Sequence, residues 1–272
     1  MTNIPKKRIF ELDALRGIAV IAMIIDHFLY LGEESQYMFP YLFSNFNSIN
    51  SNWLNGFIQF CINFQSSFFR EAGHYIFVTI FLLIAGISSS FSKNNFKRAF
   101  KVLIGALIIT IAMAIISLIS GEDYNIFFGI LHLMGTSMLL FAIIQKLYPN
   151  KWLYLAMGII IVIWGFIIKW YDVPYVCTEE LNFENILLSI LGYKTTGSDH
   201  FGIIPCTGVF FIGAFFGETL YKNRTSLFPK LDKSWHKPFT YVGQHALIIY
   251  LLHQVVSIII IGILYLLAGY HF

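Results

Sequence analysis

The first apolar stretch of this sequence contains charged and imidazole side chains that could bind a ligand or transfer a proton. The segment ELDALRGIAVIAMIIDHF holds Asp13, Arg16, Asp26 and His27. Asp13 and Arg16 stand three residues apart, so on a helix they share a face and can form an ion pair. Arg16 and His27 stand eleven residues apart, or three turns plus about 20°, which places them on one stripe about 16 Å apart. Asp26 points about 100° away from His27, so a direct Asp–His pair within this helix is not implied.

Each of these features also has a purely structural interpretation. An ion pair of Asp13 with Arg16 could anchor the end of the helix at an interface. His27 could form a buried hydrogen bond to a neighbouring helix. The two features at this spacing favour a guanidinium near one end of the helix and a functional imidazole toward the other.

Five further histidines lie in or near apolar stretches. Histidine can act as an acid, base or nucleophile near neutral pH, although each of them could instead hydrogen-bond between helices. No H-x-x-x-H or H-E-x-x-H pattern is present, so we expect no metal site. The five histidines, with one neighbouring carboxylate, are His74, His132 in FGILHLMG, Asp199 and His200 before FGIIPCTG, and His245 and His253 in VGQHALIIYLLHQ.

The composition of the chain excludes a water-facing surface. Hydrophobic residues make up 57% and charged residues 12% of the sequence, and the mean hydropathy is +0.69. A soluble domain has roughly 25% charged residues. The sequence therefore predicts an all-α, polytopic membrane bundle that forms a single domain over residues 1–272, with the lipid bilayer as a partner.

About seven stretches are long and apolar enough to cross a bilayer, which takes about 20 residues. The segment 53–69 is interrupted by Asn and Gln and fits an interfacial or re-entrant segment better than a span. The segment 183–193 is too short to cross. The seven predicted spans are 12–31, 73–92, 99–119, 126–146, 151–170, 202–221 and 242–268.

The distribution of basic residues predicts a cytoplasmic N-terminus. Cytoplasmic loops carry an excess of Lys and Arg. An odd number of spans then puts the C-terminus outside, and two long outer loops cover 33–72 and 171–201. No cluster of the kind that binds nucleic acid is present, and anionic lipid headgroups would account for the basic loops. Most of the 18 basic residues fall in the segments 6–8, 93–101, 146–151 and 222–237.

Five blocks, in this order, resemble one family. They are RIFELDALRGIAVIAMIIDH, LIAGISSSFSKNNFKRAFK, FFGILHLMG, SDHFGIIPCTGVFFIG and VGQHALIIYLLHQ. Over residues 8–257 the chain resembles a bacterial member of the heparan-alpha-glucosaminide N-acetyltransferase catalytic-domain family. The first block is also similar to the wider transmembrane acyltransferase superfamily. Members of that superfamily share an Arg and a His separated by ten residues, which correspond here to Arg16 and His27.

The resemblance implies a membrane acyltransferase. Its donor would be acetyl-CoA on the cytoplasmic side, and its acceptor a hydroxyl or amine of an extracytoplasmic glycan or lipid-linked sugar. His27 would be the general base or a transient acyl carrier, and Asp13 would hold Arg16 for contact with the phosphates of the donor. The animal enzyme is thought to use a histidine after its first helix, for which His74 is the candidate.

The resemblance also suggests secondary roles for the remaining polar residues. His132 and His245 would line the path of the donor, and His253 would join the catalytic group and orient the acceptor. Asp26, Asp199 and His200 would contact the acceptor. The expected location is the bacterial cytoplasmic membrane. A homodimer is one expected oligomeric state, and a monomer is the other.

Two other functions fit the same residues. Charged and imidazole side chains inside a membrane suit a proton-coupled transporter of small molecules, but no internal repeat of the kind many transporters show is present. A non-catalytic subunit of a cell-envelope complex would need no affinity for acyl-CoA. Binding of acyl-CoA and proton-dependent uptake into liposomes discriminate among the three.

Overall fold

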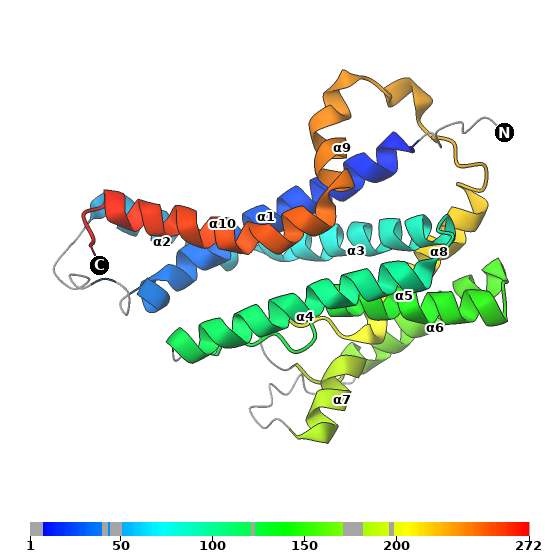
Figure 1. Cartoon of the computed structure of the whole chain (residues 1–272), viewed down its shortest axis with the longest axis horizontal. Helices are drawn as coiled ribbons and strands as arrows, with labels where there is room; N and C mark the ends of the chain where they lie inside the picture. Colours follow the sequence, from blue (N-terminus) through cyan, green and yellow to red (C-terminus); the bar gives the residue numbers. More distant parts are fainter. Residues whose placement is uncertain are drawn as a thin grey trace. The chain divides into compact units, whose positions relative to one another are not determined.

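All regular elements that the computed structural model describes are helices (Figure 1). The structure describes residues 8–39, 43, 51–120, 123–170, 182–195 and 199–271. The chain forms two compact units, one of Met1–Leu12 with Thr79–Lys233 and one of Asp13–Val78 with Ser234–Phe272. Helices α1 (Phe10–Met38) and α3 (Phe68–Ser90) each contribute to both units. This confirms the predicted all-α class.

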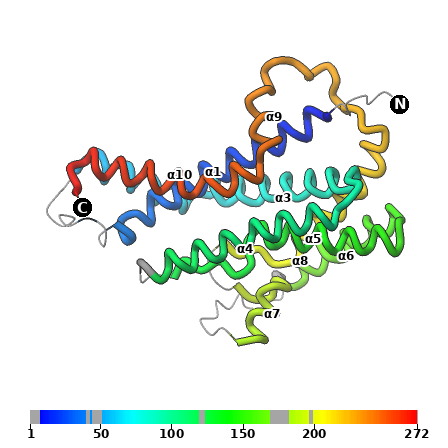
Figure 2. Tube along the Cα trace, viewed as in Figure 1, coloured from blue at the N-terminus to red at the C-terminus, as the bar shows by residue number. Residues whose placement is uncertain are grey.

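The first unit is a bundle of antiparallel and parallel helices. α4 pairs with α5, and α6 pairs with α8 (Figure 1, Figure 2). Its core includes a cluster of buried aromatic rings from three helices, Phe141, Tyr154, Phe210 and Phe211. The helices of this unit, besides the end of α3, are α4 (Asn95–Ser120), α5 (Ile130–Leu147), α6 (Lys151–Trp170), α7 (Phe183–Leu191) and α8 (Ile203–Thr219), with the short η3 (Pro229–Leu231).

A close backbone approach joins α3 to α8. A Cβ atom added to Gly86 would lie 2.0 Å from the carbonyl oxygen of Phe210, so only glycine fits there. Small residues permit such contacts between apolar helices, where van der Waals packing is the main source of association.

Three side chains satisfy the carbonyl groups at the end of α3. Arg98 donates to the carbonyl of Ser88 (3.0 Å), and Asn95 donates to that of Ser89 (2.9 Å). Arg224 donates to the carbonyl of Phe91, the first residue after α3 (3.2 Å), and lies over its ring. Cations near a helix C-terminus interact favourably with the helix dipole, so two of the basic residues have a structural role here.

The second unit is built around α1 and α10, which run in the same direction. Gly17 meets the backbone of Gly243, and further along Ser35 lies 3.0 Å from Tyr265. Besides α1 and the start of α3, this unit contains α2 (Asn52–Gln65), η4 (Ser234–His236), α9 (Lys237–Gln244) and α10 (Ala246–Leu267).

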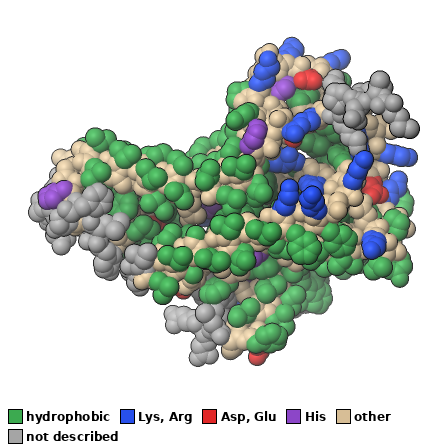
Figure 3. Space-filling model, in the orientation of Figure 1, with side chains coloured by type: hydrophobic (Ala, Val, Ile, Leu, Met, Phe, Trp, Pro, Cys, Tyr) green, Lys and Arg blue, Asp and Glu red, His purple; other side chains and the backbone are tan. Residues whose placement is uncertain are grey.

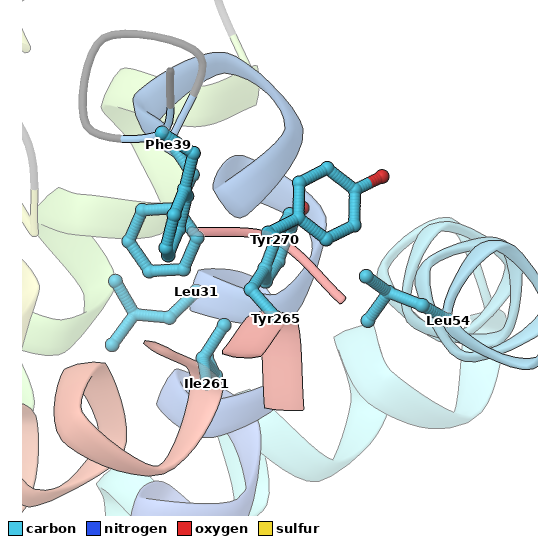
Figure 4. Close-up of a cluster of buried hydrophobic side chains, with 7 residues drawn as sticks. Leu31, Phe39, Leu54, Ile261, Tyr265 and Tyr270 are labelled. Carbon is cyan, nitrogen blue, oxygen red and sulfur yellow. The ribbon is translucent and has the colours of Figure 1, made fainter. Parts of the chain in front are cut away.

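An aromatic cluster forms the core at the C-terminal ends of α1 and α10 (Figure 4). The ring of Tyr265 packs edge-on against Phe39 and stacks on Phe43. Leu54 brings α2 into the same cluster, which also contains Leu31, Ile261 and Tyr270. α1 continues as helix to Met38, beyond residue 31 where the predicted span ends, and Ser35 in this added part lies 3.0 Å from the Tyr265 hydroxyl.

Six described helices are long and apolar enough to cross a membrane, and α8 is a seventh apolar helix of 17 residues. Successive spans alternate in direction, so a parallel α1 and α10 require an odd number of crossings. Counting α8 as a span satisfies this requirement. α2, with 14 residues, and α7, with 9 residues, are too short to cross a 30 Å hydrocarbon core. Neither segment was predicted as a span, α7 because of its length and α2 because Asn and Gln interrupt it.

Large apolar side chains are exposed along α4 and along α10, as Figure 3 shows for the visible face. On a protein in water such stripes would be unfavourable, whereas acyl chains of a bilayer cover them. The protein is therefore a multi-pass membrane protein. The stripe on α10 includes Ile248, Leu252, Val255, Ile259 and Ile263.

Candidate active site

Two imidazole rings from opposite ends of the sequence meet in the second unit. The Nδ1 atom of His27 on α1 lies 3.0 Å from the Nε2 atom of His253 on α10. Their ring centroids are 5.0 Å apart, with an angle of 31° between the planes. The Nδ1 atom of His253 is bonded to the carbonyl oxygen of Tyr250, one turn earlier. His253 is buried, and His27 is of intermediate exposure as a whole residue.

The pattern of α10 explains why His253 faces α1. Its buried residues recur every three or four positions and form one helical stripe. The stripe contains both tyrosines, the histidine and the serine of the helix, whereas the exposed face carries aliphatic residues. Because lipid contact favours the aliphatic face, the imidazole is directed into the unit. The buried residues are Tyr250, His253, Ser257, Ile261 and Tyr265.

The ion pair predicted at the start of α1 is present. Nη1 of Arg16 lies 3.0 Å from Oδ1 of Asp13 and also donates to the carbonyl oxygen of Gly243 at 3.4 Å. Gln244 donates to the other carboxylate oxygen of Asp13 at 3.4 Å. Gly243 lies at the C-terminal end of α9, where the helix dipole favours a cation. The Arg16 side chain is 20% exposed, so it is held in place and still reachable.

Asp26 forms a second polar cluster with residues of α2 and α3. Arg70 donates to both of its carboxylate oxygens, at 2.8 Å and 3.2 Å. His74 Nδ1 lies 3.8 Å from Oδ2, and Gln65 donates to the Asp26 backbone carbonyl at 3.3 Å. Arg70 was not among the predicted site residues. A cation in the apolar run SSFFREAGH was the available signal, because a charge beside a span usually has a partner.

His132 lies in the first unit, where both of its ring nitrogens have partners. Its Nδ1 accepts a hydrogen bond from the backbone N–H of Gly129, at 3.3 Å, and so caps the start of α5. Its Nε2 then carries the proton and donates to Thr110 on α4 at 3.3 Å. Through these bonds His132 caps α5 and links it to the paired helix α4.

Asp199 and His200 also lie in the first unit, immediately before α8. Asp199 has a positive φ of 50°. Nε2 of His200 donates to the carbonyl of Ser189 at 2.9 Å. Burial lowers the pKa of His200, and the bond to Ser189 opposes this effect in part.

His245 separates α9 from α10 and is exposed. Its Nδ1 bonds the carbonyl of Tyr241 at 2.9 Å, one turn earlier. The second unit thus contains three polar groups of predicted residues, Asp13 with Arg16, Asp26 with His74, and His27 with His253. Within the described residues, no group of three or more His, Cys, Asp and Glu side chains could hold a metal ion.

The apolar helices, with polar groups directed away from the lipid-facing stripes, define a multi-pass membrane protein that carries ionisable residues within its spans. A family model described as heparan-alpha-glucosaminide N-acetyltransferase, catalytic, matches residues 8–255. The chain belongs to this family, which confirms the resemblance and indicates membrane acetyltransferase activity. The match includes both His27 and His253. Searches among curated proteins and among solved structures gave no match.

Proposed function

We propose that this protein transfers an acetyl group from cytoplasmic acetyl-CoA to a hydroxyl or amine of an extracytoplasmic glycan or lipid-linked sugar. The observation that carries the proposal is the contact between His27 and His253. Both residues lie within the part of the chain that matches the acetyltransferase family. An imidazole with a fixed partner is the type of group that moves protons in acyl transfer.

The chemistry needs one proton acceptor near the thioester. His27 takes the proton of the acceptor O–H or N–H as that oxygen or nitrogen attacks the thioester carbonyl. The C–S bond then breaks, and the departing sulfur receives the proton from His27, which gives free CoA and the acetylated acceptor. In a second form of the proposal, His27 itself carries the acetyl group between donor and acceptor.

Arg16 is the residue we propose for the phosphates of the donor. A guanidinium matches phosphate oxygens through paired N–H groups. Its contacts with Asp13 and with the Gly243 carbonyl restrict its orientation. Eleven residues of α1 separate it from His27, or about 16 Å along the helix, so the acyl end of an extended donor could reach the imidazole.

Arg16, proposed to bind the donor, lies near the start of α1. Because the donor is cytoplasmic, this proposal requires the N-terminus to be on the cytoplasmic side. We place the protein, as a single domain over residues 1–272, in a bacterial cytoplasmic membrane, as a monomer or a homodimer. His74, His253 and Asp26 would act near the acceptor. We also assign His132 and His245 to the donor path, and Asp199 and His200 to acceptor contact.

Radiolabelled acetyl-CoA and purified protein test the proposal. Wild type, His27→Ala and Arg16→Ala would be assayed for labelled acetate and for labelled envelope glycan, with His271→Ala as a control. His271 is exposed and lies outside the family match. We expect transfer in wild type and in the control, a loss of about 10²-fold or more in His27→Ala, and a raised KM for acetyl-CoA in Arg16→Ala. No binding and no turnover in wild type would refute the proposal.

A further inference from the structure

We propose that His253 is a positioning residue that holds His27 in one tautomer, with the proton on Nδ1 and the lone pair on Nε2. This inference rests on the proposed function for its chemical meaning, because it names the nitrogen of His27 that meets the reacting group. The assignment of protons itself follows from hydrogen-bond partners alone.

The chain of bonds starts at a group that can only accept. The carbonyl oxygen of Tyr250 has no proton, so the Nδ1 atom of His253 that bonds it must carry one. A neutral imidazole carries a single N–H, and therefore Nε2 of His253 has a lone pair. That lone pair lies 3.0 Å from Nδ1 of His27, which consequently donates.

A second contact gives the same result without His253. Nδ1 of His27 also lies 3.0 Å from the Sδ atom of Met23, one turn earlier on α1. A thioether sulfur is a weak acceptor and has no proton to donate. Two acceptors that come from different helices thus face the same nitrogen, and both require the proton on Nδ1.

This arrangement leaves Nε2 of His27 as the basic nitrogen. Among the described residues, no hydrogen bond involves this atom. When Nε2 receives a proton from the acceptor, His27 becomes a cation, and its Nδ1–H bond to His253 becomes a stronger, charge-assisted bond. His253 therefore fixes the ring before reaction and stabilises its charged form during it, so it acts on the reaction through His27.

Nitrogen-15 NMR of protein labelled at histidine reads the tautomer directly, since protonated and unprotonated ring nitrogens resonate far apart. The signals of His27 are assigned by their absence in His27→Gln. We expect Nδ1–H and an unprotonated Nε2 for His27 in wild type without substrate. An Nε2–H tautomer for His27 would overturn the inference, whatever the turnover.

Two substitutions at His253 separate positioning from packing. In His253→Gln, the amide oxygen can occupy the place of Nε2 and accept from His27. In His253→Asn, the shorter amide can still donate to the Tyr250 carbonyl but does not reach His27. Both variants are amides, so a general loss of packing would affect both.

We expect His253→Gln to keep the Nδ1–H signal of His27 and a kcat within about tenfold of wild type. In His253→Asn we expect a mixture of His27 tautomers and a kcat lowered about 10²-fold at an unchanged KM for acetyl-CoA. Equal kcat values for the two variants would overturn the positioning role. The expected tautomer in a wild type that transfers no acetyl group would support the proton assignment and refute the proposed function instead.

Discussion

Replacing Gly243 by alanine tests whether the contact between α1 and α9 holds the Asp13–Arg16 pair in place. A Cβ atom at Gly243 would lie 1.9 Å from the carbonyl oxygen of Asp13 and 2.9 Å from the nitrogen of Gly17. Both neighbours are backbone atoms, so no flexible side chain can move aside. The two backbones would have to separate by about 1 Å, which is the kind of shift that overpacking imposes.

Such a shift also breaks polar contacts that are already long. Arg16 reaches the Gly243 carbonyl at 3.4 Å, and Gln244 reaches Asp13 at 3.4 Å. Overpacking costs about 1–3 kcal/mol and each of the two lost hydrogen bonds about 1 kcal/mol, so we expect Gly243→Ala to lower the free energy of unfolding by about 3–5 kcal/mol. We also expect a raised KM for acetyl-CoA, since Arg16 loses one of its anchors.

Unfolding in detergent measures the effect, with Gly262→Ala as the matched control. Gly262 lies inside α10, and a Cβ atom there meets nothing within 4 Å. Alanine in a helix interior is favoured over glycine by about 0.5–1 kcal/mol, so the control should be unchanged or slightly more stable. Equal stability of Gly243→Ala and Gly262→Ala would refute the close approach of α1 and α9.

Three further perturbations test the second cluster, a loop histidine and a buried thiol. Asp26→Asn should lower the free energy of unfolding by about 1–3 kcal/mol because it leaves the partly buried Arg70 without its carboxylate. A loss in the double variant with Arg70→Gln that is smaller than the sum of the two single losses would indicate direct coupling, and strictly additive losses would contradict it. The lowered pKa of His200 keeps its ring neutral in the folded protein while the unfolded chain takes up a proton near pH 6.5. Its contribution is therefore present above about pH 6.5 and lost as the pH falls below it, and a pH series of unfolding curves should be flatter for His200→Gln; an unchanged slope would contradict this. Burial raises the pKa of Cys61 to about 11, so with the other two cysteines replaced by serine we expect no alkylation of the folded protein at pH 8 and rapid alkylation after unfolding; labelling of the folded form would contradict this.

The sequence alone determined the class of protein and the local geometry of α1. A charge content of 12% cannot cover a water-facing surface, and this predicted the membrane helices before any contact was known. The ion pair of Asp13 with Arg16 was predictable because residues three apart on a helix are neighbours whatever surrounds them. Length alone identified the segment of α7 as too short to cross, and the interrupting Asn and Gln residues indicated that the segment of α2 is not a full span.

Only the tertiary structure decided which histidine partners which. His27 and His253 are 226 residues apart, and periodicity gives the face of each helix but not the helix that lies opposite. Read singly, His132 had the same pattern as His253, yet it caps α5 through Gly129. Asp26 likewise stands next to His27 in the chain but is bonded to Arg70. Long-range pairing depends on how whole helices pack, which is a property of all their side chains together and is not encoded in the spacing of any one motif.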